Sequence, residues 1–236
     1  MNRLKHIHLT APHNPISYSS ASELQDILVR HFISSKSSPD PSTLPRPTVF
    51  TMEMKPVYSF GRRQQQDADS LAKVAELKQK VEDADQVFSM RGGQTTYHGP
   101  GQLVAYPVID LKTYKMTAKC YVRALERSAI ELLERFGLHA KTTENTGVWL
   151  TDQEKIASIG VHMRRHITSH GIAINAFTNL SYFDYIVACG LPEAQATSIK
   201  KAAPAEWDAQ MRGVDDPIRE LGATFTQILD HNLHNA

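Results

Sequence analysis

The chain has 236 residues, of which 41% are hydrophobic and 22% charged, and its formal net charge is +1. Such a chain can bury a substantial core, and we expect one domain over residues 1–236. A net charge this close to zero excludes a general electrostatic attraction to nucleic acid or to an acidic membrane. No apolar run is long enough to predict a membrane-spanning helix.

The opening residues predict a strand and then a helix. Leu4, Ile7 and Leu9 fit a first strand, and a helix is expected at about 22–32. The same opening is basic and rich in serine and histidine, with no acidic residue before Glu23, a composition that also occurs in mitochondrial transit peptides. We favour the strand.

A serine- and proline-rich segment at about 34–47 is the only low-complexity part of the chain. We interpret it as a flexible insertion, because too little chain precedes it to form a separate domain. Beyond it, hydrophobic patterns predict strands at about 48–54, 104–110, 147–150, 156–161 and 171–176, and helices at about 69–81, 117–136 and 217–233. Because strands and helices do not alternate regularly, the expected fold class is α+β.

The segment 91–102, with the sequence RGGQTTYHGPGQ, is the most informative motif. Glycine allows a backbone to approach a ligand closely, so the segment predicts a binding wall of main-chain amides, with Arg91 and His98 as polar groups. An ordinary glycine-rich hairpin is the alternative. No Gly-Lys-Ser/Thr sequence follows the segment, as a nucleotide phosphate loop requires, and the glycine spacing of dinucleotide-binding proteins is also missing.

Two further residues are candidates for catalysis. Lys155 begins an apolar, β-prone segment, where burial would favour a neutral amine that can act as an acid or base; a solvated strand end is the alternative. Cys189 lies in an apolar run interrupted by Gly190 and Pro192, where a thiol either faces a pocket or fills a core. Cys120 is the only other cysteine, so no disulfide framework is expected, and we interpret Cys120 as a packing or surface residue of a helix.

Three histidines recur at every fourth residue. On a helix, His162, His166 and His170 could gather a metal ion. Ile167 and Gly171 disfavour a helix here, and no carboxylate ligand lies nearby in the sequence, so we expect no metal site.

Four motifs, in this order, resemble those of the lipoyl(octanoyl) transferases. They are the glycine-rich segment through Tyr106, the segment from Lys155 to Gly160, residues 168–175 with Tyr182 and Phe183, and the segment from Cys189 to Leu191 with Thr197 and Ser198. The resemblance covers roughly residues 48–200 and favours a eukaryotic mitochondrial member, in the matrix, with a bacterial cytoplasmic protein as the alternative. It implies a single catalytic domain of the biotin/lipoate protein ligase type, in which helices flank a mixed β-sheet.

The resemblance also implies a reaction. Acyltransferases of this family move an octanoyl group from octanoyl-acyl carrier protein to a lysine amine of a lipoyl domain, a step of lipoate biosynthesis and protein lipoylation. The expected acceptors are lipoyl domains of 2-oxoacid dehydrogenase subunits and the glycine cleavage H protein. No cofactor is expected other than the phosphopantetheine on the carrier. The family's nucleophile, which forms an acyl thioester, falls on Cys189, and its activating lysine falls on Lys155.

Substrate contacts implied by the resemblance fall on three segments. They are Arg91, Gly92, Gly93, Gln94, Thr95, Thr96, Tyr97 and His98; Ser158, Ile159 and Gly160; and Gly171, Ile172 and Ala173. An apolar slot for the acyl chain is expected along Leu103, Val104, Ile172 and Ala173. His98 either orients the thioester or Lys155, or fixes the loop by hydrogen bonding.

Basic pairs at 62–63, 164–165 and 200–201 are expected to be solvated surface, although one of them could dock an acidic carrier protein. Three other functions remain open. An ATP-dependent lipoate or biotin ligase shares the scaffold but needs no cysteine. A lipoyl amidotransferase keeps the cysteine and the lysine but takes its acyl group from another lipoyl protein. A binder of lipoyl domains would show no transfer.

Overall fold

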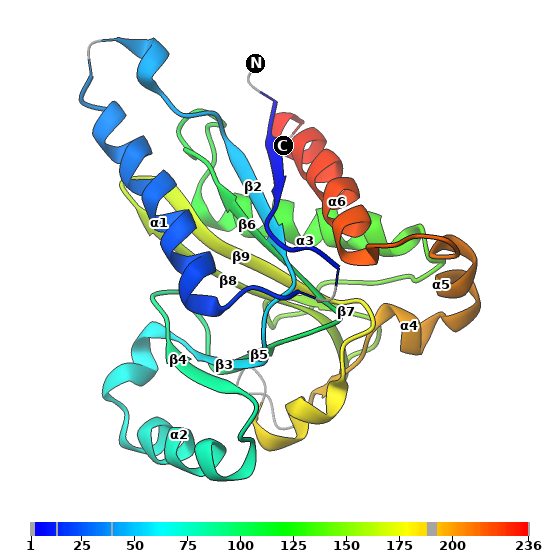
Figure 1. Cartoon of the computed structure of the whole chain (residues 1–236). Coiled ribbons are helices and arrows are strands. Elements are labelled where there is room, and N and C mark those ends of the chain that lie inside the picture. Colours follow the sequence, from blue (N-terminus) through cyan, green and yellow to red (C-terminus); the bar gives the residue numbers. More distant parts are fainter. Residues whose placement is uncertain (1–2, 13, 39, 188–192, 236) are drawn as a thin grey trace.

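The computed structural model describes residues 3–12, 14–38, 40–187 and 193–235. At its centre lies a mixed sheet with the strand order β1-β2-β6-β9-β8-β10, to which β7 is added by pairing with β8 (Figure 1). These strands are β1 (Lys5–His8), β2 (Thr48–Met52), β6 (Gln102–Val108), β7 (Val148–Trp149), β8 (Glu154–Arg164), β9 (Ile167–Asn175) and β10 (Gln195–Ala196). The pairs β1–β2 and β8–β10 are parallel, and the other pairs are antiparallel.

Helices cover both faces of this sheet. Helix α1 (Tyr18–Ser35) lies across one face, while α3 (Ala118–Glu134) and α6 (Pro217–His234) lie across the other (Figure 1). Because side chains alternate along a strand, β6 supplies both cores: Leu103 packs with α3 and α6, and Val104 packs with α1. The predicted α+β arrangement, a mixed sheet flanked by helices, is thus confirmed.

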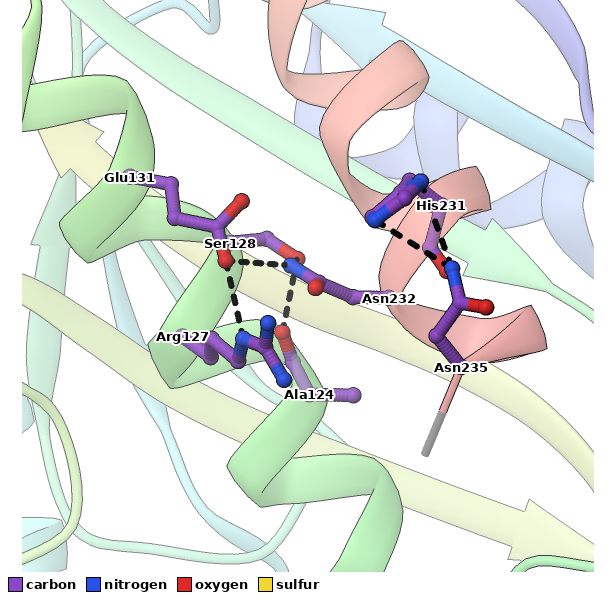
Figure 2. A network of polar contacts seen from close by, with 7 residues as sticks. All are labelled: Ala124, Arg127, Ser128, Glu131, His231, Asn232 and Asn235. Atoms are coloured by element: carbon purple, nitrogen blue, oxygen red, sulfur yellow. Dashed lines mark hydrogen bonds and ion pairs between the residues drawn. The ribbon is translucent and has the colours of Figure 1, made fainter.

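Polar contacts also join α3 to α6 (Figure 2). The Asn232 side-chain amide donates to Ser128 Oγ at 3.0 Å and to Glu131 Oε1 at 3.3 Å. Ser128 in turn donates to the backbone carbonyl of Ala124, and Arg127 pairs with Glu131. These bonds satisfy the Asn232 amide donors within an otherwise apolar helix interface, whereas Asn232 Oδ1 has no partner among the described residues.

A smaller sheet lies at one end of the large one (Figure 1). Its order is β4-β3-β5, with β3 (Val57–Phe60), β4 (Asp85–Phe88) and β5 (Thr96–His98), and it packs with η2 (Arg62–Gln66), α2 (Ala68–Lys80) and η3 (Leu180–Tyr185). The predictions did not include this sheet, because strands of three or four residues carry little periodic signal.

The other predicted elements are present with shifted ends. Strand β1 and all the predicted helices form. Helix α1 extends to Ser35, and the serine- and proline-rich segment contains the short helix η1 (Pro41–Thr43). The short helices α4 (Ile199–Ala202) and α5 (Pro204–Gln210) were not predicted. Among the helices of the described residues, none has the length and hydropathy needed to cross a membrane.

Candidate active site

A cavity of about 250 Å³ lies where the glycine-rich segment and β5 meet β8 and β9. Most of the predicted substrate contacts line it: Arg91, Gly93, Gln94, Thr96, His98, Ser158, Ile159, Gly160, Gly171, Ile172 and Ala173. Lys155 lines it too. The cavity therefore brings together three segments that are separated by up to eighty residues in the sequence.

Gly92, Thr95 and Tyr97 do not line this cavity. The Gly92 amide donates to the Val161 carbonyl at 3.0 Å, and Thr95 accepts from the Gln64 side-chain amide at 3.0 Å. Tyr97 points to the opposite side of β5, where its ring stacks on Tyr182 at a centroid distance of 4.5 Å. These residues fix the loop and the strand from behind the cavity wall.

The expected acyl slot is only half right. Ile172 and Ala173 line the cavity, but Leu103 and Val104 are fully buried in the two cores and do not reach it. The reason is their position on β6, a central strand covered on both faces. Tyr106, further along the same strand, lines the cavity instead.

Arg91 braces the glycine-rich segment from within. Its guanidinium donates to the backbone carbonyls of Gln94 at 2.9 Å and Gly92 at 3.1 Å, and its Nε donates to Ser59 Oγ at 3.1 Å. Gly160 on β8 makes room for this side chain, because a Cβ there would lie 2.8 Å from Arg91 Cδ. The loop is thus shaped by a buried cation.

Lys155 is only 7% exposed, so the structure contradicts the solvated strand end. Its Nζ donates to the Thr146 carbonyl at 2.9 Å and lies 5.0 Å from the centroid of the Trp149 ring. Gly147 has φ +131°, and a Cβ there would lie 2.5 Å from Lys155 Cε. The Lys155 side chain therefore fits here only because residue 147 is a glycine.

Glu126 of α3 lies behind this lysine and was not predicted. Its carboxylate accepts from the Gly147 amide at 3.1 Å, so it holds the loop whose carbonyl receives Lys155. Burial raises the pKa of Glu126, while the bond from Gly147 and the nearby charges of Arg123 and Lys155 oppose that rise. A carboxylate within the apolar stripe of a predicted helix was the signal that could have identified it.

His98 is buried and oriented by a chain of amides. Gln102 donates through Nε2 to Asn175 Oδ1 at 2.9 Å, and Asn175 donates to the Thr197 carbonyl at 2.9 Å. Gln102 Oε1 therefore faces His98 Nδ1 at 2.7 Å, which makes Nδ1 the donor and leaves Nε2 as an acceptor. Burial, reinforced by Arg91, lowers the pKa of His98 to about 4 against the opposing bond to Gln102.

His170 was noted in the sequence as part of a motif and of a histidine series, but not as a cavity residue, and it lines the cavity. Its backbone amide donates to Gln25 Oε1 of α1 at 2.8 Å, and Gln25 Nε2 lies 3.4 Å from His170 Nδ1. Burial and then Arg91 lower the pKa of His170 to about 3. With His162 on β8, His166 in the turn and His170 on β9, the three histidines do not share a helix.

Cys189, the predicted nucleophile, lies outside the described residues. Shortly after it in the sequence, β10 pairs with β8, so that Ala196 is opposite Lys155. Next to it, the Thr197 amide donates to the Lys155 carbonyl at 2.9 Å. Thr197, which belongs to the downstream part of the cysteine motif, therefore lies directly beside Lys155. Cys120 is exposed in the first turn of α3, so of its two interpretations, packing or surface, the surface one is correct.

Comparison with known proteins shows the family to which the chain belongs. The family model described as the lipoyl protein ligase A/B catalytic domain matches residues 17–215. A protein of Schizosaccharomyces pombe named "Probable octanoyltransferase" is 43% identical over 202 residues, covering 85% of this chain and 88% of its own. The mitochondrial octanoyl-acyl-carrier-protein:protein N-octanoyltransferase of Danio rerio is 40% identical over 212 residues, covering 90% and 88%.

The fold has solved counterparts as well. The bipartite lipoate protein ligase of Thermoplasma acidophilum, from a study that includes its E2 lipoyl domain, superimposes with a TM-score of 0.58 at 17% identity, covering 99% of this chain and 84% of that one. At that identity the likeness concerns the fold alone, and it confirms the expected ligase-type architecture. Together, the matched domain and the two close relatives establish that the chain belongs to the lipoyl protein ligase A/B catalytic-domain family, as one of its octanoyltransferases.

Proposed function

We propose that this octanoyltransferase takes its acyl group from octanoyl-acyl carrier protein and passes it, through a thioester on Cys189, to a lysine amine of lipoyl domains. The acceptors would include those of 2-oxoacid dehydrogenase subunits and the glycine cleavage H protein. The printed name of the Danio rerio relative supports the donor, and the lipoyl domain studied with the archaeal ligase supports the acceptor. The observation that carries the proposal is the buried Lys155 side chain, held at the wall of a cavity that combines glycines and apolar residues with polar side chains.

In the first half-reaction the Cys189 thiolate attacks the carbonyl carbon of the octanoyl thioester. A new carbon–sulfur bond forms, the bond to the phosphopantetheine sulfur breaks, and that sulfur takes a proton from Lys155. A free cysteine is only a few per cent thiolate at neutral pH, and a nearby ammonium favours the charged sulfur. Thr146 takes one of the three N–H donors of Lys155 and thereby fixes the position of the ammonium.

In the second half-reaction the lipoyl lysine attacks the acyl-enzyme. An amide bond forms, the Cys189 thiolate leaves, and the now neutral Lys155 accepts the proton that the incoming amine loses. Both half-reactions therefore use one side chain, which returns to its starting state.

The carbonyl oxygen becomes negatively charged in both steps, and polar groups of the cavity would stabilise it. The Gly92 amide is already bonded to Val161, which leaves the Gly93 amide as the candidate from this loop. Thr96 adds a buried hydroxyl that has no hydrogen-bond partner among the described residues. One such donor is commonly worth about 3 kcal/mol in a transition state.

The acyl chain would lie against Tyr106, Ile172 and Ala173, which line the cavity. Transfer of a CH₂ group from water to an apolar site contributes about 0.8 kcal/mol, so an octanoyl chain can gain several kcal/mol. Exclusion of water from the same space would protect the thioester from hydrolysis.

The proposal is tested by a transfer assay without ATP. Purified protein, octanoyl-acyl carrier protein and a lipoyl domain are mixed, and the mass of the lipoyl domain is followed. We expect octanoylation that is lost in Cys189→Ala, at least tenfold slower in Lys155→Ala, and unchanged in Cys120→Ala, the matched control for an exposed thiol.

Two results would select the alternatives. A requirement for ATP, with activity retained in Cys189→Ala, would indicate a ligase. Transfer from an octanoylated lipoyl protein but not from the carrier would indicate an amidotransferase.

We also propose a mitochondrial matrix location, supported by the mitochondrial name of the Danio rerio relative. Expression with a C-terminal fluorescent tag and protease protection of purified mitochondria would test it. Signal inside the inner membrane is expected, and a purely cytosolic signal would contradict it.

A further inference from the structure

A second groove, of about 460 Å³, opens beside the octanoyl cavity. Arg62, Arg63 and the glycine-rich segment form one side, and Val161 to Met163 of β8 form the other. Arg63, Arg91 and Gly93 line both the groove and the cavity, so the two spaces are adjacent. We call this space the arginine groove.

Every charged residue that lines the arginine groove is basic. Three other surface cavities within the described residues contain acidic residues: the one along α3 contains Glu126, Glu131, Glu134 and Glu144 beside its basic residues, and the ones near α6 and α2 contain aspartates. The octanoyl cavity is likewise lined by basic but no acidic residues, so positive charge is concentrated at these two adjacent spaces, in a chain whose net charge is only +1.

The backbone holds these arginines in place. Gly61 packs against the glycine-rich segment so closely that a Cβ would lie 1.9 Å from the Gly93 carbonyl oxygen. The Arg62 amide donates to the Arg91 carbonyl at 3.1 Å, and Gln64 Oε1 accepts from the Gly61 amide at 3.0 Å. The short helix η2 is thereby fixed on the loop, and the backbone of its two arginines is fixed beside the cavity.

The side chains of these arginines remain available to a partner. Arg62 and Arg63 are exposed, and neither forms an ion pair with any residue that the structure describes. Arg164, another basic candidate from the sequence, pairs with Asp26 at 3.6 Å. Half-buried His162 lies within the field of Arg62: burial lowers its pKa, and Arg62 and then Arg164 lower it further.

We propose that the arginine groove docks the acidic surface of the acyl carrier protein, so that the acylated arm enters the adjoining cavity. This inference rests on the proposed function, because it assumes a carrier-bound donor. The guanidinium groups of Arg62 and Arg63, which form no ion pair within the described residues, attract carboxylates and accelerate association, whereas a chain of almost zero net charge gives no long-range attraction of its own.

The test compares donors in the Arg62→Glu variant, because Arg62 lines the groove but not the octanoyl cavity. The donors are octanoyl-acyl carrier protein, octanoyl-phosphopantetheine and octanoyl-N-acetylcysteamine. We expect kcat/KM to fall about tenfold or more with the carrier and to change less than about twofold with the two small thioesters. Added salt should slow the wild type with the carrier and affect the variant much less.

Two further variants serve as controls. Lys200→Glu makes the same change in charge at an exposed lysine that lines neither space, and its rates should match the wild type. Arg62→Lys keeps the positive charge and should retain most of the activity with the carrier.

The docking proposal is overturned by an equal loss with all three donors, or by equal losses in Arg62→Glu and Lys200→Glu. It is also overturned by an equal loss with the carrier and with octanoyl-phosphopantetheine, since Arg62 would then act on the phosphate of the arm. Failure of the proposed function is distinct: the wild type would octanoylate a lipoyl domain from none of the donors.

Discussion

Gly147 decides whether Lys155 can lie at the cavity wall. Its φ of +131° is unfavourable for other residues, and its missing side chain leaves the space that the lysine stem occupies. Glu126 fixes the same residue from α3 by accepting its amide hydrogen. The position of the ammonium thus depends on a glycine and a buried carboxylate that are not part of the sequence motif.

Gly147→Ala should therefore impair catalysis. Its Cβ would displace Lys155 Cε and would also press on the Ala157 carbonyl oxygen of β8, and a shift of about 1 Å at a reacting group can cost up to about 100-fold in rate. We expect octanoyl transfer to slow by roughly 10- to 100-fold, measured as the initial rate with the carrier donor. Gly213→Ala is the control, because Gly213 also has a positive φ, of +76°, but has open space around it. Equal rates in the two variants would contradict this role.

His170 makes stability depend on pH. Its pKa is lowered to about 3 in the folded protein, mainly by burial, against about 6.5 in an unfolded chain. The stability that the folded protein has with neutral His170 is complete above about pH 6.5. It is lost as the pH falls from there towards 3, because His170 of the unfolded chain binds a proton first. From pH 7.5 to pH 5, about 2 kcal/mol should be lost through this residue.

His170→Asn removes the titrating group and suits the positive φ of 55° at this position. Urea unfolding measures the free energy of unfolding at pH 7.5 and at pH 5. Between these two values, the free energy of unfolding of the variant should fall by about 2 kcal/mol less than that of the wild type. Loss of ring packing against Tyr106 would lower stability at both pH values alike. An unchanged difference between the two pH values would show that His170 takes up its proton equally in both states.

At the scale of elements, the small sheet anchors the segment that precedes the cysteine motif. Tyr58 of β3 donates to the Tyr182 carbonyl at 2.8 Å, and the Tyr182 hydroxyl donates to Asp83. Tyr182 also stacks on Tyr97 of β5. Helix η3 is thereby attached to the same strand that carries Thr96 and His98 into the cavity.

Tyr58→Phe should loosen η3. Loss of the hydroxyl removes a part-buried hydrogen bond, a change that costs about 0.5–1.5 kcal/mol. We expect that loss in the free energy of unfolding, together with faster amide hydrogen exchange at Ile186, whose amide donates to Phe183. Tyr114→Phe is the control, since the Tyr114 hydroxyl is buried and has no partner among the described residues. Exchange at Ile186 that is identical in both variants would argue against the anchor.

The long elements could be predicted because their periodic apolar patterns match their packing. Helix α3 presents Tyr121, Leu125 and Leu132 to one core, and its pattern alone indicated this. The small sheet could not be predicted, since its three short strands become a sheet only by pairing with one another. Two of its strands, β3 and β5, are joined by a pairing of Val57 with His98, some forty residues apart.

The residues of the candidate site also fall into a predictable and an unpredictable group. Lys155, Arg91 and His98 were predicted because they lie within recognisable motifs. Glu126 and Gln25 were not, because they act through contacts that are remote in sequence: Gln25 meets His170 across 145 positions. The placement of Cys189 beside Lys155 remains a prediction.

At the scale of the whole molecule, the two cores share the central sheet. Strand β6 contributes Leu103 to one core and Val104 to the other, and Gly101 is bonded to the chain beyond β9 through Ala176 and Phe177. We therefore expect the chain to unfold as one domain, although the small sheet has its own apolar cluster.

Differential scanning calorimetry tests this expectation. One transition whose calorimetric and van't Hoff enthalpies agree is expected for a single cooperative unit. A separate, earlier transition that is shifted by Tyr58→Phe alone would show that the small sheet unfolds independently.

The central claim is that the octanoyl group passes through Cys189 under the control of Lys155. Intact-mass measurement after rapid mixing of the protein with octanoyl-acyl carrier protein, in the absence of a lipoyl domain, tests it most directly. The account predicts one added octanoyl group, mapped by peptide mass to Cys189, absent in Cys189→Ala and slower to form in Lys155→Ala. Octanoylation of a subsequently added lipoyl domain without any such adduct, or an adduct on Cys120 instead, would contradict it.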